Sequence, residues 1–203
     1  MNNMAPTKAN LIKSRSLLEF SRKGFDLLDK KRNVLIREMI GLVNRANTIQ
    51  AEISDVFNDA YTALEYANIT MGSGSMSEIA SSIPEEKEYE VLTRSVMGVE
   101  IPLVRFEEEK LEASYGFFRS NASLDVAVSS FEKVKYMIYE LAEIETSVYK
   151  LAMEIKKTQK RANALDKISI PKYEEITKSI ENALEEKERE DFFRLKKVKD
   201  KVR

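Results

Sequence analysis

Histidine, cysteine and tryptophan are absent from this 203-residue sequence, and glycine (6) and proline (4) are scarce. Without histidine or cysteine, the chain has no Cys–His or Ser–His catalytic arrangement, no thiolate redox centre and no zinc site built on imidazole or sulfur. Its aspartates and glutamates form no cluster typical of a magnesium site. Six glycines are too few for the many turns of an all-β fold. We therefore expect no catalytic, cofactor-binding or metal-binding residues, and no cofactor.

Targeting signals and strong charge asymmetry are also missing. No signal peptide opens the chain, and no apolar run approaches the roughly 20 residues that span a bilayer. The lack of cysteine fits a reducing cytoplasm. The net charge is −1 with both signs interspersed, whereas a nucleic-acid binder usually carries a basic excess. These features predict a cytoplasmic protein without membrane insertion and without a nucleic-acid partner.

The composition present is that of long helices. Charged residues make up 33% of the chain and hydrophobic residues 43%, a mixture typical of helices built from straight-chain side chains. Thr7 is the expected N-cap of the first helix. From there, seam residues recur every seven positions in two series: Leu11, Leu18, Phe25, Arg32, Met39, Ala46, Ile53, Ala60 and Ala67, and Ser14, Ser21, Leu28, Leu35, Leu42, Ile49, Val56, Ala63 and Thr70. So strict a repeat predicts a left-handed supercoil, with a helix of ~90 Å.

The middle of the chain predicts a break and a β-hairpin. The run Gly72-Ser73-Gly74-Ser75 ends the first helix, and residues 76–86 are expected to be a short helix or loop that includes Pro84. Two β-branched runs then flank Met97-Gly98, so we predict a hairpin near residues 89–106 with a positive φ at Gly98. Pro102 has no N–H to donate, so its strand should expose that edge.

A second long helix begins between residues 107 and 123. Its seam reads Val134, Met137, Leu141, Ile144, Val148, Leu151, Ile155, Thr158, Ala162 and Leu165. Pro171 interrupts this pattern and predicts a kink or short break around residues 166–172. Ile176, Ile180, Ala183 and Leu184 then resume the apolar face, and Leu195, Val198 and Val202 supply its last apolar contacts.

The expected fold is therefore mainly α: a long antiparallel two-helix left-handed coiled coil with a small β-hairpin and short helices in the middle of the chain. Its parts are an N-terminal helix at 1–71, a connecting region at 72–110, and a C-terminal helix at 111–203 that is kinked near 166–172. Each helix has a narrow apolar stripe, which the other helix can cover. A parallel homodimer of each helix is the competing arrangement.

Arg32 stands on an otherwise apolar seam, and two interpretations of it stay open. It either pairs with a carboxylate of the partner helix and fixes the register, or extends outward along its aliphatic stem. The C-terminal end is locally basic, with Lys196, Lys197, Lys199, Lys201 and Arg203. These cations either bind a partner or form a solvated helix end.

Three parts of the chain resemble the signatures of the D subunit of V/A-type (vacuolar/archaeal-type) rotary ATPases. The amino-terminal signature is carried by residues 6–11 and 24–32, the middle one by residues 95–102, and the carboxy-terminal one by residues 160–165, 170–171, 185–190 and 194–196. They occur in the family's order and span nearly the whole chain. Residues 72–88 match no signature.

The resemblance implies a non-catalytic central rotor shaft, one copy per complex, peripheral to the membrane. One end would enter the hexamer of catalytic A and B subunits, the F subunit would pack on the lower shaft, and the C (or d) subunit would link it to the membrane ring. Rotation would then couple ion flow, of H⁺ or Na⁺, to nucleotide turnover.

Two sets of side chains are candidates for partner contacts in such a shaft. Arg189, Arg194, Lys196, Lys197 and Lys199 are expected to meet acidic rims in the bore of the hexamer, or else to form a solvated face. Val96, Met97, Gly98 and Val99 of the hairpin are expected to dock a neighbour or regulate it, or else to cap the connection between the helices. The alternative function is a coiled-coil chaperone or scaffold of the prefoldin-like type, which the three signatures disfavour.

Overall fold

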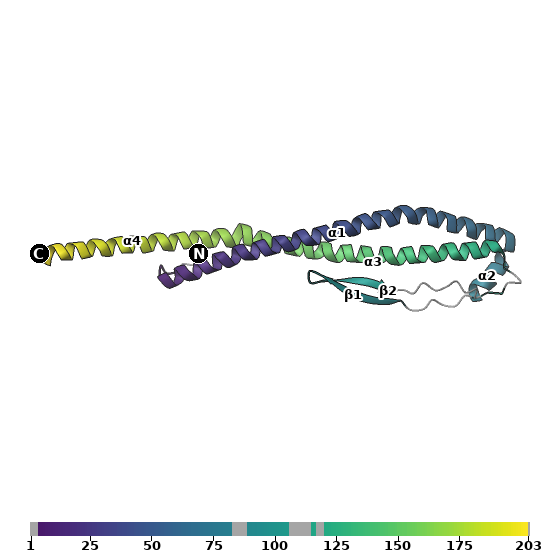
Figure 1. Cartoon of the computed structure of the whole chain (residues 1–203), viewed down its shortest axis with the longest axis horizontal. Coiled ribbons are helices and arrows are strands. Elements are labelled where there is room, and N and C mark those ends of the chain that lie inside the picture. The colour runs from purple at the N-terminus through teal and green to yellow at the C-terminus, as the bar shows by residue number, and fades with distance from the viewer. Residues whose placement is uncertain (1–3, 83–88, 106–114, 117–119, 203) are drawn as a thin grey trace. The chain divides into compact units, whose positions relative to one another are not determined.

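A computed structural model describes residues 4–82, 89–105, 115–116 and 120–202. The elements, in chain order, are α1 (Lys8–Met71), α2 (Ser73–Ser82), β1 (Glu90–Val96), β2 (Val99–Arg105), α3 (Ala122–Ala164), the π-helical turn η1 (Leu165–Ser169) and α4 (Ile170–Val202). The chain packs as two compact units, residues 1–34 with 155–203 and residues 35–154. Figure 1 labels these elements along the chain.

The ends of α1 follow from local capping. Thr7 Oγ1 accepts a hydrogen bond from the Asn10 N–H at 3.2 Å, which confirms the predicted N-cap. At the other end Gly72 takes a positive φ of 80° and donates its N–H to the Asn68 carbonyl at 2.9 Å, as a C-terminal glycine cap does. The interruption is shorter than the sequence predicted, because α2 begins directly after Gly72. Pro84 and the rest of residues 83–88 lie outside the described residues.

The predicted seams are the inward faces of both helices. Each of the predicted α1 seam positions is buried or half-buried except Thr70, and so is every seam position predicted for the second helix from Val134 to Leu165. The largest fully buried side chains include Leu35, Ile144 and Leu151. The seven-residue repeat therefore identified the interface correctly, because only one stripe of each helix is covered. The predicted start of the second helix at residue 111 lies outside the described residues.

In the unit formed by residues 35–154, α1 and α3 run antiparallel. Arg45 donates to Glu140 at 2.6 Å through Nε, and further along α1 the ring of Tyr61 meets that of Phe131 edge to face at 5.5 Å. At the end of this unit Ala67, Ile79 of α2 and Leu124 form a buried cluster. Partner numbers fall along α3 as they rise along α1, so the pairing is within one chain and antiparallel, as predicted.

In the unit formed by residues 1–34 and 155–203, α1 is held to α4 by ion pairs at heptad intervals. Lys8 lies 3.3 Å from Glu188, Arg15 2.6 Å from Glu181, and Arg22 2.6 Å from Glu174. The fully buried seam of this unit consists of Ser14, Ser21, Thr158, Ala162, Thr177 and Ile180, and all of these except Ile180 are small or polar. Small seam residues let two helix backbones approach closely.

Pro171 is accommodated by the π-helical turn that precedes it. The Ile170 N–H bonds to the Leu165 carbonyl, five residues back instead of four. A proline ring clashes with the carbonyl four residues before it, and the wider π turn displaces that carbonyl. The irregularity predicted at 166–172 is therefore a π-helical turn in continuous helix and not a chain break. Gly24 of α1 lies opposite, where a Cβ would be 3.4 Å from Leu165 Cδ1.

The hairpin has a two-residue turn at Met97-Gly98, with Val96 paired to Val99. Gly98 has φ 79°, as predicted, and Met97 also has a positive φ of 50°, which together match the type I′ turn of tight hairpins. The hairpin packs on α3 within the unit of residues 35–154: Ile101 is 3% exposed, and the Val104 N–H donates to Glu143 Oε2 at 2.8 Å. Figure 1 shows it alongside α3.

Candidate partner-binding surfaces

The C-terminal part of α4 is exposed on all sides. Every described side chain from residue 185 to residue 201 is solvent-exposed, although the helix continues without interruption to Val202. The last interhelical ion pair, Lys8–Glu188, coincides with the first residue of α1. Beyond it, α4 is a single helix of high charge, and such a helix depends on partners or on its own side-chain pairs for stability.

The five predicted cations of α4 all lie on this exposed segment. Arg189 contacts Glu185 at 3.3 Å, and Arg194 contacts Glu190 at 3.5 Å and Asp191 at 3.8 Å. These are contacts within one helix, which contribute about 0.3–0.5 kcal/mol each and exchange readily. In the described part of the chain, no ion pair is formed by the remaining three cations, Lys196, Lys197 and Lys199. The set is therefore available to an acidic partner.

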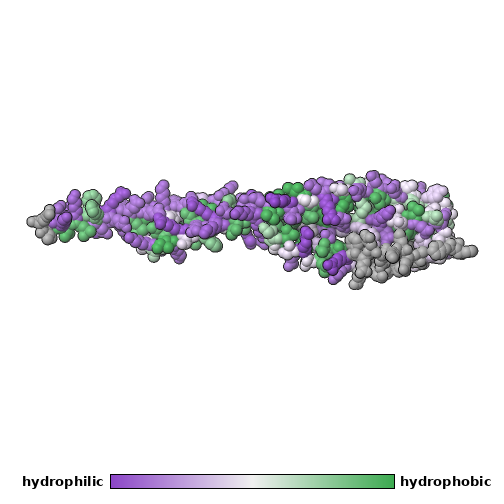
Figure 2. Space-filling view, viewed as in Figure 1, coloured by the Kyte–Doolittle hydropathy of each residue, from purple (hydrophilic) through white to green (hydrophobic). Residues whose placement is uncertain are grey.

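Large apolar side chains share the same segment. Phe192, Phe193, Leu195 and Val198 are each between 59% and 70% exposed. The sequence prediction that Leu195 and Val198 make apolar contacts with the other helix is wrong, because α1 does not extend alongside them; Val202 carries no described side chain. Phe192 and Phe193 were missed as candidates, although two adjacent aromatics in a charged helix end are a recognisable signal. Figure 2 shows apolar patches interrupting the hydrophilic surface of α4.

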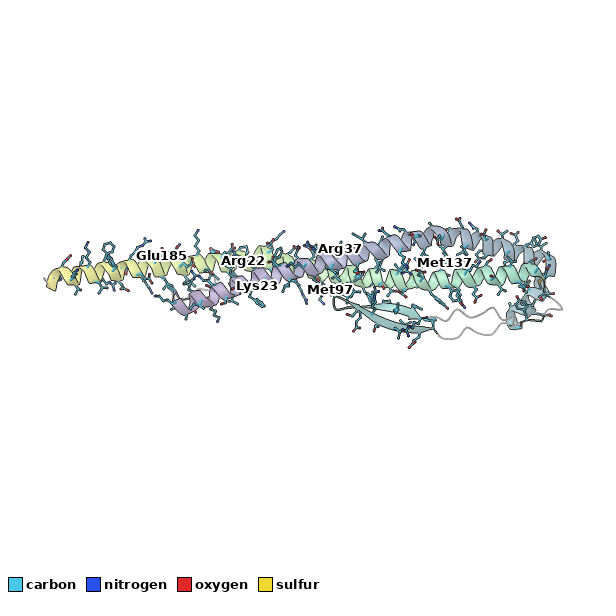
Figure 3. The ribbon with its side chains drawn as sticks, viewed as in Figure 1. Arg22, Lys23, Arg37, Met97, Met137 and Glu185 are labelled. Atoms are coloured by element: carbon cyan, nitrogen blue, oxygen red, sulfur yellow. The ribbon has the colours of Figure 1, made fainter. Side chains whose placement is uncertain are left out.

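The four predicted hairpin residues lie together at the turn. Val96 and Val99 are half-buried partners across the two strands, whereas Met97 is 48% exposed. Figure 3 shows Met97 at the tip of the hairpin. The turn thus presents one apolar side chain to solvent. These residues belong to the unit of residues 35–154, and the α4 cations belong to the other unit.

Arg32 makes contacts that neither sequence interpretation described. Its guanidinium donates to the Gln159 side-chain oxygen at 2.6 Å on the partner helix, and it lies 2.5 Å from Asp29 on its own helix. The partner across the seam is thus an amide and not a carboxylate, and the side chain is only 23% exposed instead of extending into solvent. Its Nε is buried without a hydrogen-bond partner, which carries an energetic cost.

The described residues contain no cluster of side chains suited to bind a metal ion. No group of three or more carboxylates in residues 4–82, 89–105, 115–116 and 120–202 is placed to hold a metal ion. A shallow hollow of about 470 Å³ between α1 and α3 is lined mostly by small and apolar side chains, with Asp59 its one carboxylate. Within the same described ranges, no helix combines the length and apolar character that crossing a bilayer needs.

Among the described ionisable groups of the unit of residues 35–154, Tyr115 has a clearly perturbed pKa. Burial raises the pKa of Tyr115 to about 12, and its hydrogen bond to Asp125 adds to this shift. The Tyr115 hydroxyl donates to Asp125 Oδ1 at 2.6 Å, and its ring packs against the cluster of Ala67, Ile79 and Leu124. The interaction attaches the segment before α3 to the first turn of that helix and gives Tyr115 a structural role.

Two antiparallel helices with a seven-residue seam, a docked hairpin and an exposed charged end define a coiled-coil protein. The family model for the D subunit of ATP synthase matches residues 10–200. The chain is 44% identical to the V-type ATP synthase D subunit of Thermotoga neapolitana over 98% of both chains. It is 38% identical to the A-type ATP synthase D subunit of Thermococcus kodakarensis, over 97% of this chain and 94% of that one.

A third relative, the A-type ATP synthase D subunit of Methanopyrus kandleri, is 36% identical over all of this chain and 88% of its own length. The chain belongs to the D-subunit family of V/A-type ATP synthases, as its three signature segments predicted.

Proposed function

We propose that this chain is the central-stalk (rotor shaft) subunit of a V/A-type ATP synthase. In this role it carries torque between the A/B catalytic hexamer and the ion-translocating ring in the membrane, and it catalyses no reaction itself. Membership of the D-subunit family supports the assignment to the complex. The observation that carries the shaft role is the exposed segment at residues 185–201 of α4, which extends past the start of α1 from residue 189 onward.

Contacts between this helix and the hexamer would bias the catalytic sites. A shaft can favour one conformation of a surrounding subunit only if it contacts that conformation with a different free energy. Rotation and nucleotide affinity are then reciprocally linked. The exposed end of α4 meets this requirement because apolar and basic side chains alternate around it. The apolar ones include Phe192, Leu195 and Val198, and the basic ones Arg194, Lys196 and Lys197. Different faces present different chemistry at each rotary angle.

Basic side chains suit the moving contact. Arg189, Arg194, Lys196, Lys197 and Lys199 can pair with acidic rims in the bore of the hexamer. Exposed ion pairs contribute about 0–1 kcal/mol each, so they exchange without deep energetic traps. The apolar side chains supply contact area that does not depend on ionic strength.

Torque must also be transferred between the two helices. In the unit of residues 1–34 and 155–203, Arg15 contacts Glu181 through both Nε and Nη2, at 3.1 and 2.6 Å. Such two-nitrogen contacts are better defined in geometry than single ones. Together with Lys8–Glu188 and Arg22–Glu174 they link α1 to α4 at three levels, so a twist applied to α4 is shared by α1.

The remaining partners follow from the same proposal. The F subunit packs on the lower part of the shaft, and the C (or d) subunit connects it to the membrane ring, with one copy of this chain per complex. The chain itself lies on the cytoplasmic side, peripheral to the membrane as part of the complex. The hairpin turn, Val96 to Val99, docks a neighbouring subunit through the exposed Met97 side chain.

A rotation assay on hexamers of A and B subunits tests the proposal. In hexamers that carry the full chain, the chain should rotate and its rotation should be coupled to ATP hydrolysis. Hexamers that carry a chain without residues 190–203 should lose torque. Native mass spectrometry should count one copy of the chain per hexamer. If truncation left torque unchanged, or if the chain failed to enter the hexamer and instead suppressed aggregation of unfolded clients, the shaft assignment would be wrong.

A second set of variants isolates the charges. Changing Arg189, Arg194, Lys196, Lys197 and Lys199 together to glutamine should reduce coupling and its dependence on salt. The matched control replaces five exposed lysines elsewhere, Lys13, Lys30, Lys150, Lys156 and Lys160, by glutamine and should leave coupling unchanged. Equal coupling in both variants would reject the charge contacts while leaving the shaft role intact.

A further inference from the structure

The two edges of the hairpin are treated differently by the rest of the molecule. Val96 and Val99 flank a two-residue turn and therefore form a hydrogen-bonded pair, so pairs along the hairpin alternate from there. Residues 92, 94, 96, 99, 101 and 103 consequently direct their N–H and C=O groups between the strands. Residues 91, 93 and 95 of β1, and 100, 102 and 104 of β2, direct theirs outward.

The outer edge of β2 is closed to further pairing. Pro102 has no N–H to offer, as expected from the sequence, and the outward N–H of Val104 is already bonded to Glu143 of α3 at 2.8 Å. Proline and a covering helix are two of the means by which natural proteins prevent unwanted pairing at a sheet edge. The β2 edge carries both.

The outer edge of β1 carries none of these protections. Val91, Thr93 and Ser95 are all exposed, and Val91 is 54% exposed. None of the three is a proline or a charged residue, and the register from Glu90 to Val96 is continuous, without a bulge. In the described part of the chain, no hydrogen bond is made by their outward backbone groups. In Figure 1, β1 is the strand on the side away from α3.

We infer that the outer edge of β1 binds an extended strand from another chain of the ATP synthase, which adds to the hairpin as a third strand. This inference rests on the proposed function. Each of Val91, Thr93 and Ser95 offers one backbone donor and one acceptor, and main-chain pairing of this kind is an established mode of recognition. The hairpin is held by the buried Ile101, by the Val104–Glu143 hydrogen bond and by a tilted contact between the rings of Tyr89 and Tyr139 at 5.4 Å, so it offers its edge on a fixed support.

The exposed charges of β1 define the chemistry of the partner strand. Glu90 and Arg94 are exposed and share one face of the strand, whereas Val91, Thr93 and Ser95 lie on the other and are uncharged. Opposite charges directly across a sheet are stabilising and like charges are not. The fitting partner therefore has a basic and an acidic residue four positions apart on one face, and uncharged, β-branched or small residues on the other.

A second copy of this chain fits the edge less well. Two copies of β1 in antiparallel orientation bring Glu90 opposite Arg94 only in the register that also places Val91 opposite Thr93. In that register Ser95 faces Tyr89, which lies outside β1 and whose ring contacts that of Tyr139. The pairing then runs past the end of the strand.

Residue-resolved amide hydrogen exchange tests the inference on the complete chain, alone and after co-expression with the remaining subunits of the complex. Alone, the amides of Val91, Thr93 and Ser95 should exchange fast and those of Leu92, Arg94 and Val96 slowly. In the complex the first three should slow by about tenfold or more, because hydrogen-bonded amides exchange only when the pairing opens.

A variant pair provides the second test. Thr93→Pro removes an outward N–H without removing a hydrogen bond of the hairpin, so it should weaken assembly by roughly tenfold. Thr93→Val keeps that N–H and should assemble as the unaltered chain does. Slow exchange of the Leu92, Arg94 and Val96 amides in Thr93→Pro would show that the hairpin of this variant remains folded. If the hairpin unfolds, the inference is judged by the amide exchange of the unaltered chain alone.

Each outcome has one meaning. If the complex assembles and the amides of Val91, Thr93 and Ser95 stay fast, the third-strand inference is wrong and the proposed function stands. If these amides are slowed in the isolated chain in proportion to its concentration, the occupant is a second copy and the inference is wrong. If the unaltered chain does not assemble with the other subunits, the proposed function fails and the inference fails with it.

Discussion

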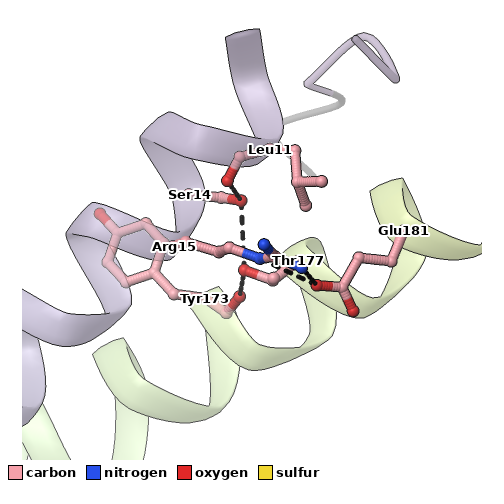
Figure 4. A network of polar contacts seen from close by, with 6 residues as sticks. All are labelled: Leu11, Ser14, Arg15, Tyr173, Thr177 and Glu181. Atoms are coloured by element: carbon pink, nitrogen blue, oxygen red, sulfur yellow. Dashed lines mark hydrogen bonds and ion pairs between the residues drawn. The ribbon is translucent and has the colours of Figure 1, made fainter. Parts of the chain in front are cut away.

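Thr177 Oγ1 lies 3.1 Å from Ser14 Oγ across the interface of α4 and α1, and both side chains are buried. Ser14 also contacts the Leu11 carbonyl at 3.0 Å and Thr177 the Tyr173 carbonyl at 2.7 Å. Two hydroxyl protons thus serve three contacts, as Figure 4 shows. The pair satisfies itself locally, so its main effect at the interface is to keep the helices close together.

The close packing at Ser14 predicts that a large substitution there destabilises the chain more than a small one. Ser14→Leu should lower the free energy of unfolding by about 1–3 kcal/mol, because an overpacked site forces the backbones apart. Ser14→Ala should cost less than about 1 kcal/mol, since Thr177 retains the Tyr173 carbonyl. Urea unfolding measures both. The control Ser16→Leu, at an exposed position of the same helix, should be neutral, and a stabilising Ser14→Leu would contradict the close approach.

The Arg32 contacts predict that an apolar replacement is tolerated better than loss of its partner. Arg32→Met should raise the free energy of unfolding by about 1 kcal/mol, because it removes a buried, unpaired Nε and a partly desolvated charge. Asp29 keeps its bond to Asn33, and Gln159 keeps its bond to Asn163.

Gln159→Leu should instead lower the free energy of unfolding by about 1–3 kcal/mol, since it leaves the guanidinium without its cross-seam acceptor. Denaturant unfolding of both variants and of the double variant completes the cycle. A loss of stability in Arg32→Met as large as that in Gln159→Leu would show that the arginine contributes more than it costs.

Replacing a glycine by alanine is expected to stabilise the chain at two positions and to destabilise it at a third. Gly41→Ala should raise the free energy of unfolding by about 0.5–1 kcal/mol, because the site is helical and nothing lies within 4 Å of the new Cβ. Gly24→Ala should do the same, with its methyl in van der Waals contact with Leu165. Gly98→Ala should lower hairpin stability by about 1 kcal/mol, because φ is 79° there. Thermal unfolding ranks the three, and a destabilising Gly41→Ala would contradict the open helical site.

The raised pKa of Tyr115 predicts that the folded chain loses stability at alkaline pH. Its pKa is raised to about 12 in the folded chain, against about 10 for an unperturbed tyrosine. The folded state therefore binds the phenolic proton more tightly, so this contribution is complete below pH ~10 and is lost as the pH rises toward ~12. In ultraviolet titration, the difference between the unaltered chain and Tyr115→Phe should have a midpoint near 12. A midpoint near 10 would mean that Tyr115 is solvated.

The elements that depend on periodicity were predictable from the sequence. The seams of both long helices, the Thr7 cap and the Met97-Gly98 turn each follow from local rules of spacing, capping and backbone conformation. The family was predictable as well, because its signature segments lie in order along nearly the whole chain. All of these signals are local or repeat at a fixed interval, so no knowledge of distant contacts was needed.

Features set by contacts between distant residues were not predictable. The choice of Gln159 as the partner of Arg32 depends on which α3 residue lies opposite, which a seven-residue repeat leaves undetermined. The sequence predicted a kink or short break at Pro171, and the periodicity does not show that a π-helical turn accommodates the proline ring there. Leu195 and Val198 were assigned contacts because the apolar pattern continues to them, but the pattern does not reveal that α1 begins too late to cover them.

The heptad spacing of the interhelical ion pairs has a consequence for the alignment of α1 and α4. Lys8, Arg15 and Arg22 are separated by seven residues, and so are their partners Glu188, Glu181 and Glu174. A displacement of one helix by a whole heptad would therefore bring Arg15 to Glu188 and Arg22 to Glu181, with most of the electrostatic attraction retained. These pairs hold the helices together but do not distinguish neighbouring alignments. That discrimination falls to Arg32 and Gln159, which occur once.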